Sequence, residues 1–467
     1  MRLLLVLTIL TVYCELSVGL ALPSIPWSRY GEPLYLTPLI NENITEAKEL
    51  AEVNLKASHA KKVESYAGLF TVNKKYNSTL FHWYFVAEEK PRTAPVLLWL
   101  NGGPGTSSLL GLFEEHGPFI VNEDIELESR EYYWTKNHHV IYIDSPVGTG
   151  FSYTDCEEGY SKNTDDVSKN LHEALEQFFK LWPNLKKNDF YLTGESYGGK
   201  YLPNLAHLII KKRKFKNFKG VAIGNGFTDP VMQVKGAGEY LYQQGFVDAA
   251  TRDLFNEKEQ KCSEIVEIIN QNQLHLLKKG ENPLQPCRDI MDPFSNNTLF
   301  ANATGYGYVY NILQSRPPVA EDSRLEAYLD KASVRKSIHV GNLPRHFEQL
   351  NVQQHLGVSI LESEKKHVEE LLAKNYKVLI YNGQLDIIFP YVITVNYLKT
   401  LDFEYMDEYN KAPRLIWKVD DDVAGYIKSA GPLTEVMVIG AGHMVPTEQP
   451  KRAWDLITKF TRDKLPK

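Results

Sequence analysis

Short apolar runs recur along the chain and are separated by polar, helix-compatible segments. They are rich in Val, Ile, Leu and Phe, and most lead into Gly, Asn, Asp or Ser, which is typical of buried strands that end in loops. The six runs are Pro95–Leu100, Val140–Asp144, Phe190–Thr193, Val221–Gly224, Val378–Tyr381 and Val436–Ile439. The segment Ser168–Pro183 has apolar residues at helical spacing and ends in proline, so it predicts a helix. Strands that alternate with helices predict an α/β fold with a mostly parallel central sheet and helices on both faces.

This alternation is interrupted after about Asp229. From there to about Arg345 the chain is polar, helix-like and irregular, and the α/β pattern resumes afterwards. A long insertion after a strand of an α/β core is a candidate lid over a site at the edge of the sheet. We therefore expect one α/β domain over residues 61–467, with a mainly helical lid at about 230–345 and an N-terminal segment over residues 22–60.

The first residues have the layout of a secretory signal peptide. Met1 and Arg2 supply a charged start, Leu3–Tyr13 is apolar, and small residues follow. The apolar run is shorter than the roughly 20 residues that span a membrane, and Glu15 interrupts it. We expect a signal peptide over residues 1–21, a mature protein without a membrane span, and entry into the secretory pathway.

Entry into this pathway makes two further patterns informative. Candidate glycosylation sites are the four Asn-x-Ser/Thr sequons at Asn43, Asn77, Asn296 and Asn302. The chain has four cysteines, and Cys14 lies in the expected signal peptide, which leaves an odd number. Cys262 and Cys287 are close in sequence, so we expect them to form a disulfide and Cys156 to be free.

Composition and charge exclude some classes of protein. Of the 467 residues, 43% are hydrophobic and 24% are charged, which is ordinary globular composition with ample length for a large core. A formal net charge of −6 provides no basic surface for nucleic acid. The cysteine spacing fits no zinc pattern, and we expect neither a metal nor a cofactor. The sequence does not indicate an oligomeric state.

A serine stands between two glycines directly after one of the predicted strands. Gly194–Gly198 matches the pattern G-x-S-x-G, with the strand Phe190–Thr193 before it and a helix-compatible segment after it. The glycines allow a sharp turn that presents the Ser196 hydroxyl at the carboxyl end of the strand, as a nucleophile. The alternative is a glycine-rich turn whose serine only caps the helix.

A nucleophilic serine needs a base, and the base needs a third group that orients it. In this fold class the order along the chain is serine, acid, histidine. Asp386 in "NGQLDIIFP" and His443 in "VIGAGHMVP" follow this order, and both lie in loops after predicted strands, where such sheets place their sites. The competing residues, which precede the serine or lie in a polar turn, are Asp144, His116 and Asp420–Asp422.

The predicted strand Pro95–Leu100 runs into a glycine-rich loop, Asn101–Gly105. Glycines let backbone N–H groups approach a ligand closely. In hydrolases of this architecture an early loop after a strand supplies one N–H donor of the oxyanion hole, and the residue after the nucleophile supplies the other. Gly103 and Tyr197 fit these two roles. A phosphate-binding loop is the rival interpretation, but its GK[ST] signature is missing.

Four of these motifs together resemble a known family. "WLNGGPGTSS", "GESYGGKYLP", "NGQLDIIFP" and "GAGHMVPTEQP" occur in the order found in the serine carboxypeptidases, and the resemblance is closest to the vitellogenic-like members and extends from about Tyr66 to the C-terminus. It implies an α/β-hydrolase fold with a helical insertion over the site. It also implies release of single C-terminal residues from peptides and proteins at acidic pH, with the destination, secreted or lysosomal or vacuolar, left open.

The resemblance further implies a pocket for the carboxylate of the substrate. Its counterparts here are Asn101, Glu115 and Glu195, with Trp99 as the supporting tryptophan. Two acids can hold a carboxylate only if they share protons and donate hydrogen bonds to it. Thr106 departs from the pattern, because many family members have a disulfide-forming cysteine there; this removes one link between loop and lid and does not affect the chemistry.

Two other functions fit parts of this pattern. An acyltransferase or esterase on the same scaffold would use the same three residues, and its preference for blocked esters over peptides with a free carboxylate would distinguish it. A non-catalytic secreted binding or storage protein would be indicated by the loss of a member of the triad. Ser196, Asp386 and His443 are all present, which argues against the binding protein, and the presence of Asn101, Glu115 and Glu195 favours the peptidase over the acyltransferase or esterase.

Overall fold

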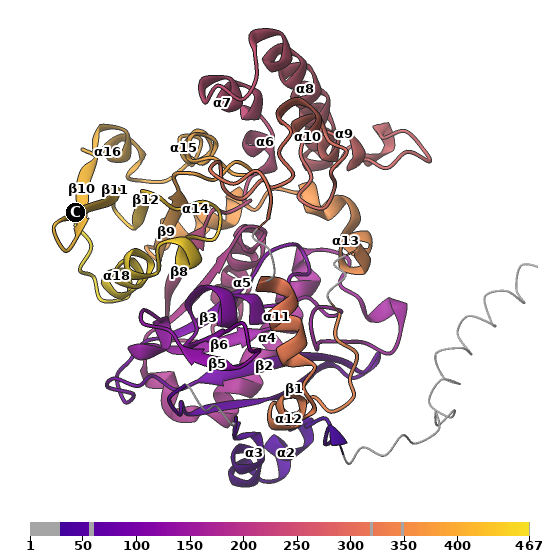
Figure 1. Ribbon diagram of the computed structural model, residues 1–467, viewed down its shortest axis with the longest axis vertical. Helices are drawn as coiled ribbons and strands as arrows, with labels where there is room; N and C mark the ends of the chain where they lie inside the picture. The colour runs from indigo at the N-terminus through magenta and orange to yellow at the C-terminus, as the bar shows by residue number, and fades with distance from the viewer. Residues whose placement is uncertain (1–28, 56–59, 318–320, 347–349, 467) are drawn as a thin grey trace, which may run out of the picture.

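The computed structural model of the protein describes residues 29–55, 60–317, 321–346 and 350–466, so the predicted signal peptide lies outside the described residues. Its centre is a sheet of ten strands in the order β1-β2-β6-β3-β7-β8-β9-β12-β11-β10 (Figure 1). The six strands from β6 to β12 run parallel, and antiparallel strands flank them at both edges. The predicted α/β fold with a mostly parallel sheet is confirmed.

All six predicted strands are present, and they form the parallel centre of the sheet. The strands of this sheet are β1 (Ser65–Asn73), β2 (Ser78–Phe85), β3 (Val96–Leu100), β6 (His139–Ile143), β7 (Phe190–Glu195), β8 (Phe218–Gly224), β9 (Lys377–Gly383), β10 (Leu415–Val419), β11 (Asp422–Ala430) and β12 (Leu433–Val438), and β4 (Phe119–Val121) pairs with β5 (Leu127–Ser129) separately. The central strands are near-continuous apolar runs because both of their faces are covered.

Strand β3 shows how the two faces are filled. Its residues alternate between two hydrophobic cores, with Leu98 and Leu100 in one and Leu97 and Trp99 in the other. Helices α4 (Thr164–Leu181), α5 (Gly198–Lys212) and α14 (Lys365–Ala373) contribute to the first core, and α18 (Pro450–Thr461) and the π-helix η2 (Gly111–His116) contribute to the second. Helices therefore cover both faces, as predicted.

Helix α4 begins earlier than the predicted Ser168. The side chain of Asn163 accepts a hydrogen bond from the Asp166 N–H and caps the helix, and two aspartates in the first turn suit its positive end.

The remaining helices are α2 (Leu36–Glu42), α3 (Ile44–Ala51), α15 (Tyr391–Leu398), α16 (Met406–Lys411) and α17 (Val445–Glu448), with short turns η3 (Trp134–Lys136), η4 (Glu157–Gly159), η5 (Pro183–Lys187), η6 (Leu274–Leu276) and η7 (Gly357–Leu361).

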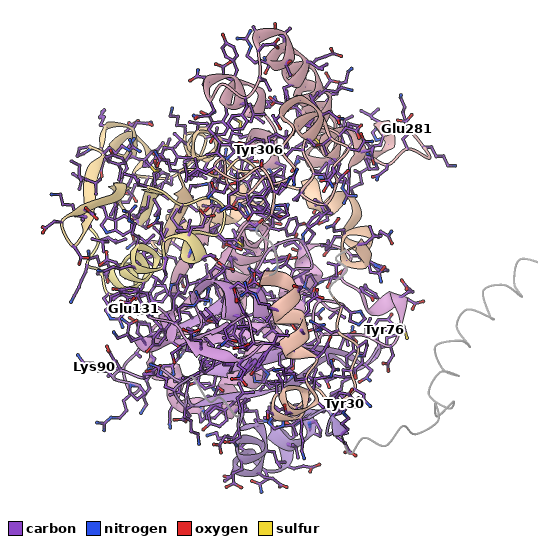
Figure 2. The ribbon with its side chains drawn as sticks, viewed as in Figure 1. Tyr30, Tyr76, Lys90, Glu131, Glu281 and Tyr306 are labelled. Carbon is purple, nitrogen blue, oxygen red and sulfur yellow. A yellow bond between two sulfur atoms is a disulfide. The ribbon has the colours of Figure 1, made fainter. Side chains whose placement is uncertain are left out.

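Apart from α14, which packs on the sheet, the helices between β8 and β9 form two groups. The first is α6 (Pro230–Gln233), α7 (Ala237–Gln243), α8 (Ala249–Asn270), α9 (Gln285–Arg288) and α10 (Leu299–Thr304), which form the upper lobe in Figure 1 together with α13 (Leu350–Leu356). Tyr306 lies within this lobe, and the loop with Glu281 projects from it (Figure 2). The second is α11 (Glu321–Leu329) and α12 (Ala332–Ser337), which lie below the upper lobe in Figure 1, with α11 packed against β4.

Backbone and side-chain hydrogen bonds fasten this second group to the N-terminal part of the chain. The N–H of Leu34 donates to the carbonyl of His339 at 3.0 Å, and the Lys331 ammonium donates to the carbonyl of Ile125 at 2.5 Å.

Among the described helices, none is long and apolar enough to cross a membrane.

The cysteines follow the prediction in part. Cys262 of α8 and Cys287 of α9 form the expected disulfide, which joins two helices of the upper lobe. The expectation that Cys156 is free is wrong, because this residue is also disulfide-bonded. The four sequon asparagines are all exposed, at Asn43, Asn77, Asn296 and Asn302.

Candidate active site

Ser196 lies in a sharp turn between strand β7 and helix α5. Its φ of 55° is in the left-handed region, which is unfavourable for a residue with a side chain and is found mainly where the surroundings impose it. Gly194 has no room for a side chain, since a Cβ there would meet the carbonyl oxygen of Leu100 at 2.3 Å. The carbonyl of Ser196 accepts the N–H of Phe227 at 2.9 Å. The turn predicted from the G-x-S-x-G pattern is therefore present.

His443 and Asp386 meet at the same end of the sheet. His443 Nδ1 lies 2.9 Å from Asp386 Oδ2, and both side chains are buried. Asp386 also accepts hydrogen bonds from the Asn225 side chain at 2.6 Å and from the Ile388 N–H at 3.0 Å. A carboxylate on Nδ1 fixes the proton of the neutral ring there and leaves Nε2 as the acceptor.

His443 Nε2 has no hydrogen-bond partner among the described residues, and His443 lines the same pocket as Ser196. The hydroxyl and the ring thus face one cavity without a direct hydrogen bond, and apo active sites are often looser than the complexes they form. The structure brings together the three residues that the sequence singled out.

The competing candidates lie elsewhere. Asp144 is buried behind the glycine-rich loop, where it accepts hydrogen bonds from the Ser107 hydroxyl and the N–H groups of Ser108 and Phe151. His116 is enclosed by aromatic rings, with Trp134 stacked on it at 3.9 Å. Asp420–Asp422 is exposed. None of these residues lines the pocket with Ser196.

The glycine-rich loop packs directly against the nucleophile turn. A Cβ on Gly102 would lie 2.4 Å from the backbone nitrogen of Tyr197 and 2.7 Å from Ser196 Cβ, so only glycine fits. Gly103 has a φ of 103° and lines the pocket, as does Tyr197. The two predicted oxyanion donors therefore belong to segments in contact. Gly102 is not among the predicted site residues, although its place in the N-G-G-P-G loop was the available signal.

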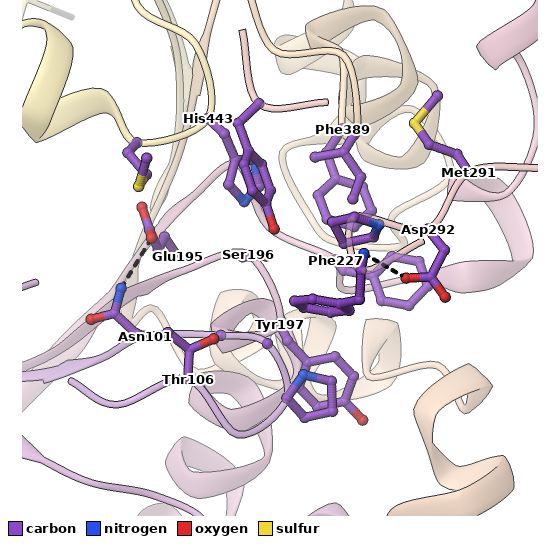
Figure 3. Close-up of a pocket in the computed structure, with 18 of the residues that line it drawn as sticks. Asn101, Thr106, Glu195, Ser196, Tyr197, Phe227, Met291, Asp292, Phe389 and His443 are labelled. Carbon is purple, nitrogen blue, oxygen red and sulfur yellow. Dashed lines mark hydrogen bonds between the residues drawn. The ribbon is translucent and has the colours of Figure 1, made fainter. Parts of the chain in front are cut away.

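Asn101 connects two buried glutamates next to this turn. Its side-chain nitrogen donates to Glu115 Oε1 at 2.8 Å. The same nitrogen donates to Glu195 Oε1 at 3.1 Å, and Figure 3 shows this second bond. Its carbonyl oxygen accepts from Trp99 Nε1 at 2.7 Å and from the Gly111 N–H at 3.0 Å. Since both donors lie at the oxygen, the network fixes the amide with its NH₂ group toward the glutamates.

Burial makes both glutamates hard to ionise. It raises the pKa of Glu115 to about 7, against the opposing effect of the Asn101 hydrogen bond. The pKa of Glu195 is raised well above its usual range by burial and by the negative charge of Glu115. Two carboxyls this close titrate as a pair, and at least one proton remains between them at neutral pH. A side-chain hydrogen bond between the two glutamates contributes to both pKa shifts, so the carboxyls are in direct contact.

Asn101 and Glu195 line a cavity of 470 Å³ together with Ser196 and His443, and Glu115 lies behind them, outside its lining. Asn101 and Glu195 lie on one side of Ser196, and Phe227 and Phe389 lie on the other (Figure 3). The two phenylalanine rings stack at 5.1 Å. The insertion between β8 and β9 closes the cavity with residues Arg288, Met291, Asp292, Pro293, Phe294, Gly307, Tyr308, Tyr310, Pro317, Gln353 and Ile360. No group of His, Cys, Asp and Glu in the described ranges is arranged to hold a metal ion.

Comparison with known proteins gives one consistent result. The model of the family described as serine carboxypeptidase matches residues 56–463. The chain is 46% identical over 448 residues to the venom serine carboxypeptidase of Apis mellifera, covering 93% of this chain and 92% of that protein. It is 44% identical over 462 residues to the vitellogenic carboxypeptidase of Aedes aegypti, covering 97% and 95%.

A solved structure shares the fold. It is the crystal structure of Kex1(Δ)p, a prohormone-processing carboxypeptidase from Saccharomyces cerevisiae, with a TM-score of 0.76 and 23% sequence identity. The match covers 89% of this chain and 96% of the yeast chain. At this identity the match establishes the α/β-hydrolase architecture.

Proposed function

The chain belongs to the serine carboxypeptidase family, and from this premise we propose that it releases single C-terminal residues from peptides through an acyl-enzyme on Ser196, at acidic pH. The observation that carries this proposal is the buried pair Glu115 and Glu195 beside the nucleophile turn, joined through Asn101. An acyltransferase or esterase that acts on blocked substrates has no use for such a pair.

In the proposed reaction the free carboxylate of the peptide binds at the acid pair and places the last peptide bond at Ser196. His443 Nε2 takes the proton of the Ser196 hydroxyl as the oxygen attacks the scissile carbonyl, and Asp386 stabilises the imidazolium that forms. The N–H groups of Gly103 and Tyr197 donate to the oxyanion. His443 then protonates the leaving amine, and the free amino acid departs.

The second half of the reaction uses the same groups. Water takes the place of the amino acid, His443 removes one of its protons, and the hydroxide attacks the acyl-enzyme. The oxyanion forms again at Gly103 and Tyr197, and Ser196 regains its proton from His443 as the shortened peptide leaves.

The preference for acidic pH follows from the acid pair. Protonated carboxyls donate hydrogen bonds to the bound carboxylate, whereas ionised ones repel it. Affinity for the substrate is therefore present below the raised pKa of Glu115, which is about 7, and is lost as the pH rises through it.

We also propose that the protein enters the secretory pathway and is glycosylated at its sequons. The support is the signal-like sequence of residues 1–21, the exposure of all four sequon asparagines and the disulfide between Cys262 and Cys287, a bond typical of oxidising compartments. One relative is named as a venom protein, which agrees with secretion. The first group of inserted helices serves as the lid.

The test uses an N-blocked dipeptide and its C-terminal amide. The wild-type protein should release the last residue of the free acid, and an organophosphate should label Ser196, as located by mass spectrometry. Ser196→Ala should lose about 10⁴-fold or more in kcat while it folds normally. Ser295→Ala, an exposed serine outside the pocket, is the matched control and should be unaffected. Near-normal turnover by Ser196→Ala, or labelling elsewhere, would refute the assignment.

A further inference from the structure

A short segment of the insertion, residues 309–313, passes between the two loops that hold Asp386 and His443. Backbone hydrogen bonds attach it to both loops. The bonds are Ile388 N–H to Val309 C=O at 3.1 Å, Ile312 N–H to Leu385 C=O at 2.9 Å, and His443 N–H to Tyr310 C=O at 2.7 Å. The first two lie on either side of Asp386, and the third involves His443 itself. The segment therefore contacts the backbone at both residues of the proposed acid–base pair.

Side chains reinforce the attachment to the histidine loop. Glu448 Oε2 accepts a hydrogen bond from the N–H of Gly442 at 2.8 Å and another from the side-chain nitrogen of Asn311. Asn311 is buried, and its side-chain oxygen accepts the Leu313 N–H at 2.8 Å, which turns its NH₂ group toward Glu448. One carboxylate oxygen thus holds the residue before His443 and the insertion at the same time.

The backbone at Gly442 is packed too closely to accommodate a side chain. A Cβ there would lie 2.3 Å from the carbonyl oxygen of Tyr310 and 2.8 Å from Glu448 Oε1. The ring of Tyr310 also stacks on that of His443, with centroids 4.9 Å apart. Since the backbone on one side of His443 and its ring face are both fixed, the direction of Nε2 depends on residues 309–313 and Glu448.

We propose that Asn311 and Glu448 are positioning residues, which hold the backbone at Gly442 and His443 so that Nδ1 stays on Asp386 and Nε2 points into the pocket. This inference rests on the proposed function, because it assigns His443 as the base. Neither residue lines the pocket, so neither touches the substrate. Proton transfer requires close approach, and a displacement of about 1 Å can reduce the rate about 100-fold.

The experiment compares Asn311→Ala, Glu448→Ala and Glu448→Gln. The glutamine oxygen can still accept both hydrogen bonds, so this variant removes the charge and keeps the geometry. Gln314→Ala is the matched control, since this exposed side chain lies next to the segment. For each variant, kcat is calculated per active site titrated to completion with an organophosphate, which excludes misfolded protein, and KM and Tm are measured as well.

The alanine variants should lose about 10- to 100-fold in kcat per titrated site, with KM within about twofold of the wild type. Glu448→Gln should stay within about threefold, and Gln314→Ala should be unchanged. The double variant Asn311→Ala/Glu448→Ala should be little worse than the worse single variant, because both remove the same hydrogen bond.

Three results would overturn the inference: a lower Tm with unchanged kcat per titrated site, a loss confined to KM, or an equal loss in Glu448→Gln and Glu448→Ala. If Glu448→Ala does not fold, the kcat per titrated site of Asn311→Ala tests the inference. Failure of the proposed function would look different, because the wild type would then not be labelled at Ser196 or Ser196→Ala would keep its turnover.

Discussion

Raising the pH from 5 to 8 should weaken the binding of peptides that have a free C-terminal carboxylate. Burial raises the pKa of Glu115 to about 7, while burial and the charge of Glu115 raise the pKa of Glu195 well above its usual range. The two carboxyls lose their protons as a pair, and the raised pKa of Glu115, about 7, lies within this interval. Each ionised Glu115 replaces a shared proton of the acid pair with a negative charge next to the pocket that Glu195 lines.

The size of the effect follows from this pKa. With a pKa of about 7, about 99% of the molecules have a protonated Glu115 at pH 5 and about 10% at pH 8. When only the protonated form binds a carboxylate, KM rises about tenfold over this range, which corresponds to about 1.4 kcal/mol. Nearly all of the rise should occur above about pH 6.5.

The assay measures KM for an N-blocked dipeptide and for its C-terminal amide at half-unit steps between pH 5 and pH 8. The amide has no charge to be repelled, so its KM should stay nearly constant. Glu115→Gln should flatten the profile of the free acid, because a glutamine donates a hydrogen bond at every pH. Glu123→Gln, an exposed glutamate of the same region, is the control and should keep the wild-type rise.

Two outcomes would refute this reasoning. A flat KM for the free acid in the wild type would show that Glu115 does not titrate against the substrate. The same rise for acid and amide would show that the pH acts on another part of the site. KM is the informative quantity, because it reports binding of the carboxylate, whereas kcat also reports the chemical step.

Two further predictions concern the backbone at the site and the buried histidines. Gly102→Ala should lower kcat about 100-fold, because its Cβ would lie 2.4 Å from the Tyr197 nitrogen and displace a proposed oxyanion donor; unchanged steady-state kinetics would contradict that role. Burial lowers the pKa of His82 to about 3 from 6.5, so only the unfolded chain binds a proton there as the pH falls below about 6.5, and His82 should cost about 3 kcal/mol of stability between pH 7 and pH 4.5. Urea unfolding at both pH values should show that His82→Gln gains stability relative to the wild type by this amount at the lower pH, and a constant difference would contradict the argument.

The sequence predicted the centre of the sheet and not its edges. The six parallel strands are buried on both faces, so they read as continuous apolar runs. Strand β10 is an edge strand, and only one of its five residues, Trp417, is buried, which leaves too little apolar pattern to recognise. The start of α4 was missed because it depends on the Asn163 cap rather than on apolar spacing.

The candidate site shows the same division. Ser196, Asp386 and His443 could be found because each follows a strand of a parallel sheet, and the carboxyl ends of such strands meet at one edge. Asn225, which donates to Asp386, was missed although it follows β8 in a glycine-flanked loop that offered the same signal. Tyr310 and Asn311 had no such signal, because their contacts depend on the path of an irregular insertion across the site.

Trp99 has a consequence for how such an enzyme can diverge. The side chain fills a hydrophobic core beneath the sheet, and its Nε1 also sets the amide of Asn101, which in turn faces both glutamates. A substitution of Trp99 by phenylalanine would keep much of the apolar contact. It would remove the indole N–H, so the side-chain amide of Asn101 would lose the hydrogen bond that orients it. Under the proposed function, natural selection for recognition of a terminal carboxylate also acts on this core residue, and neutral drift at this position is restricted for as long as the substrate stays the same.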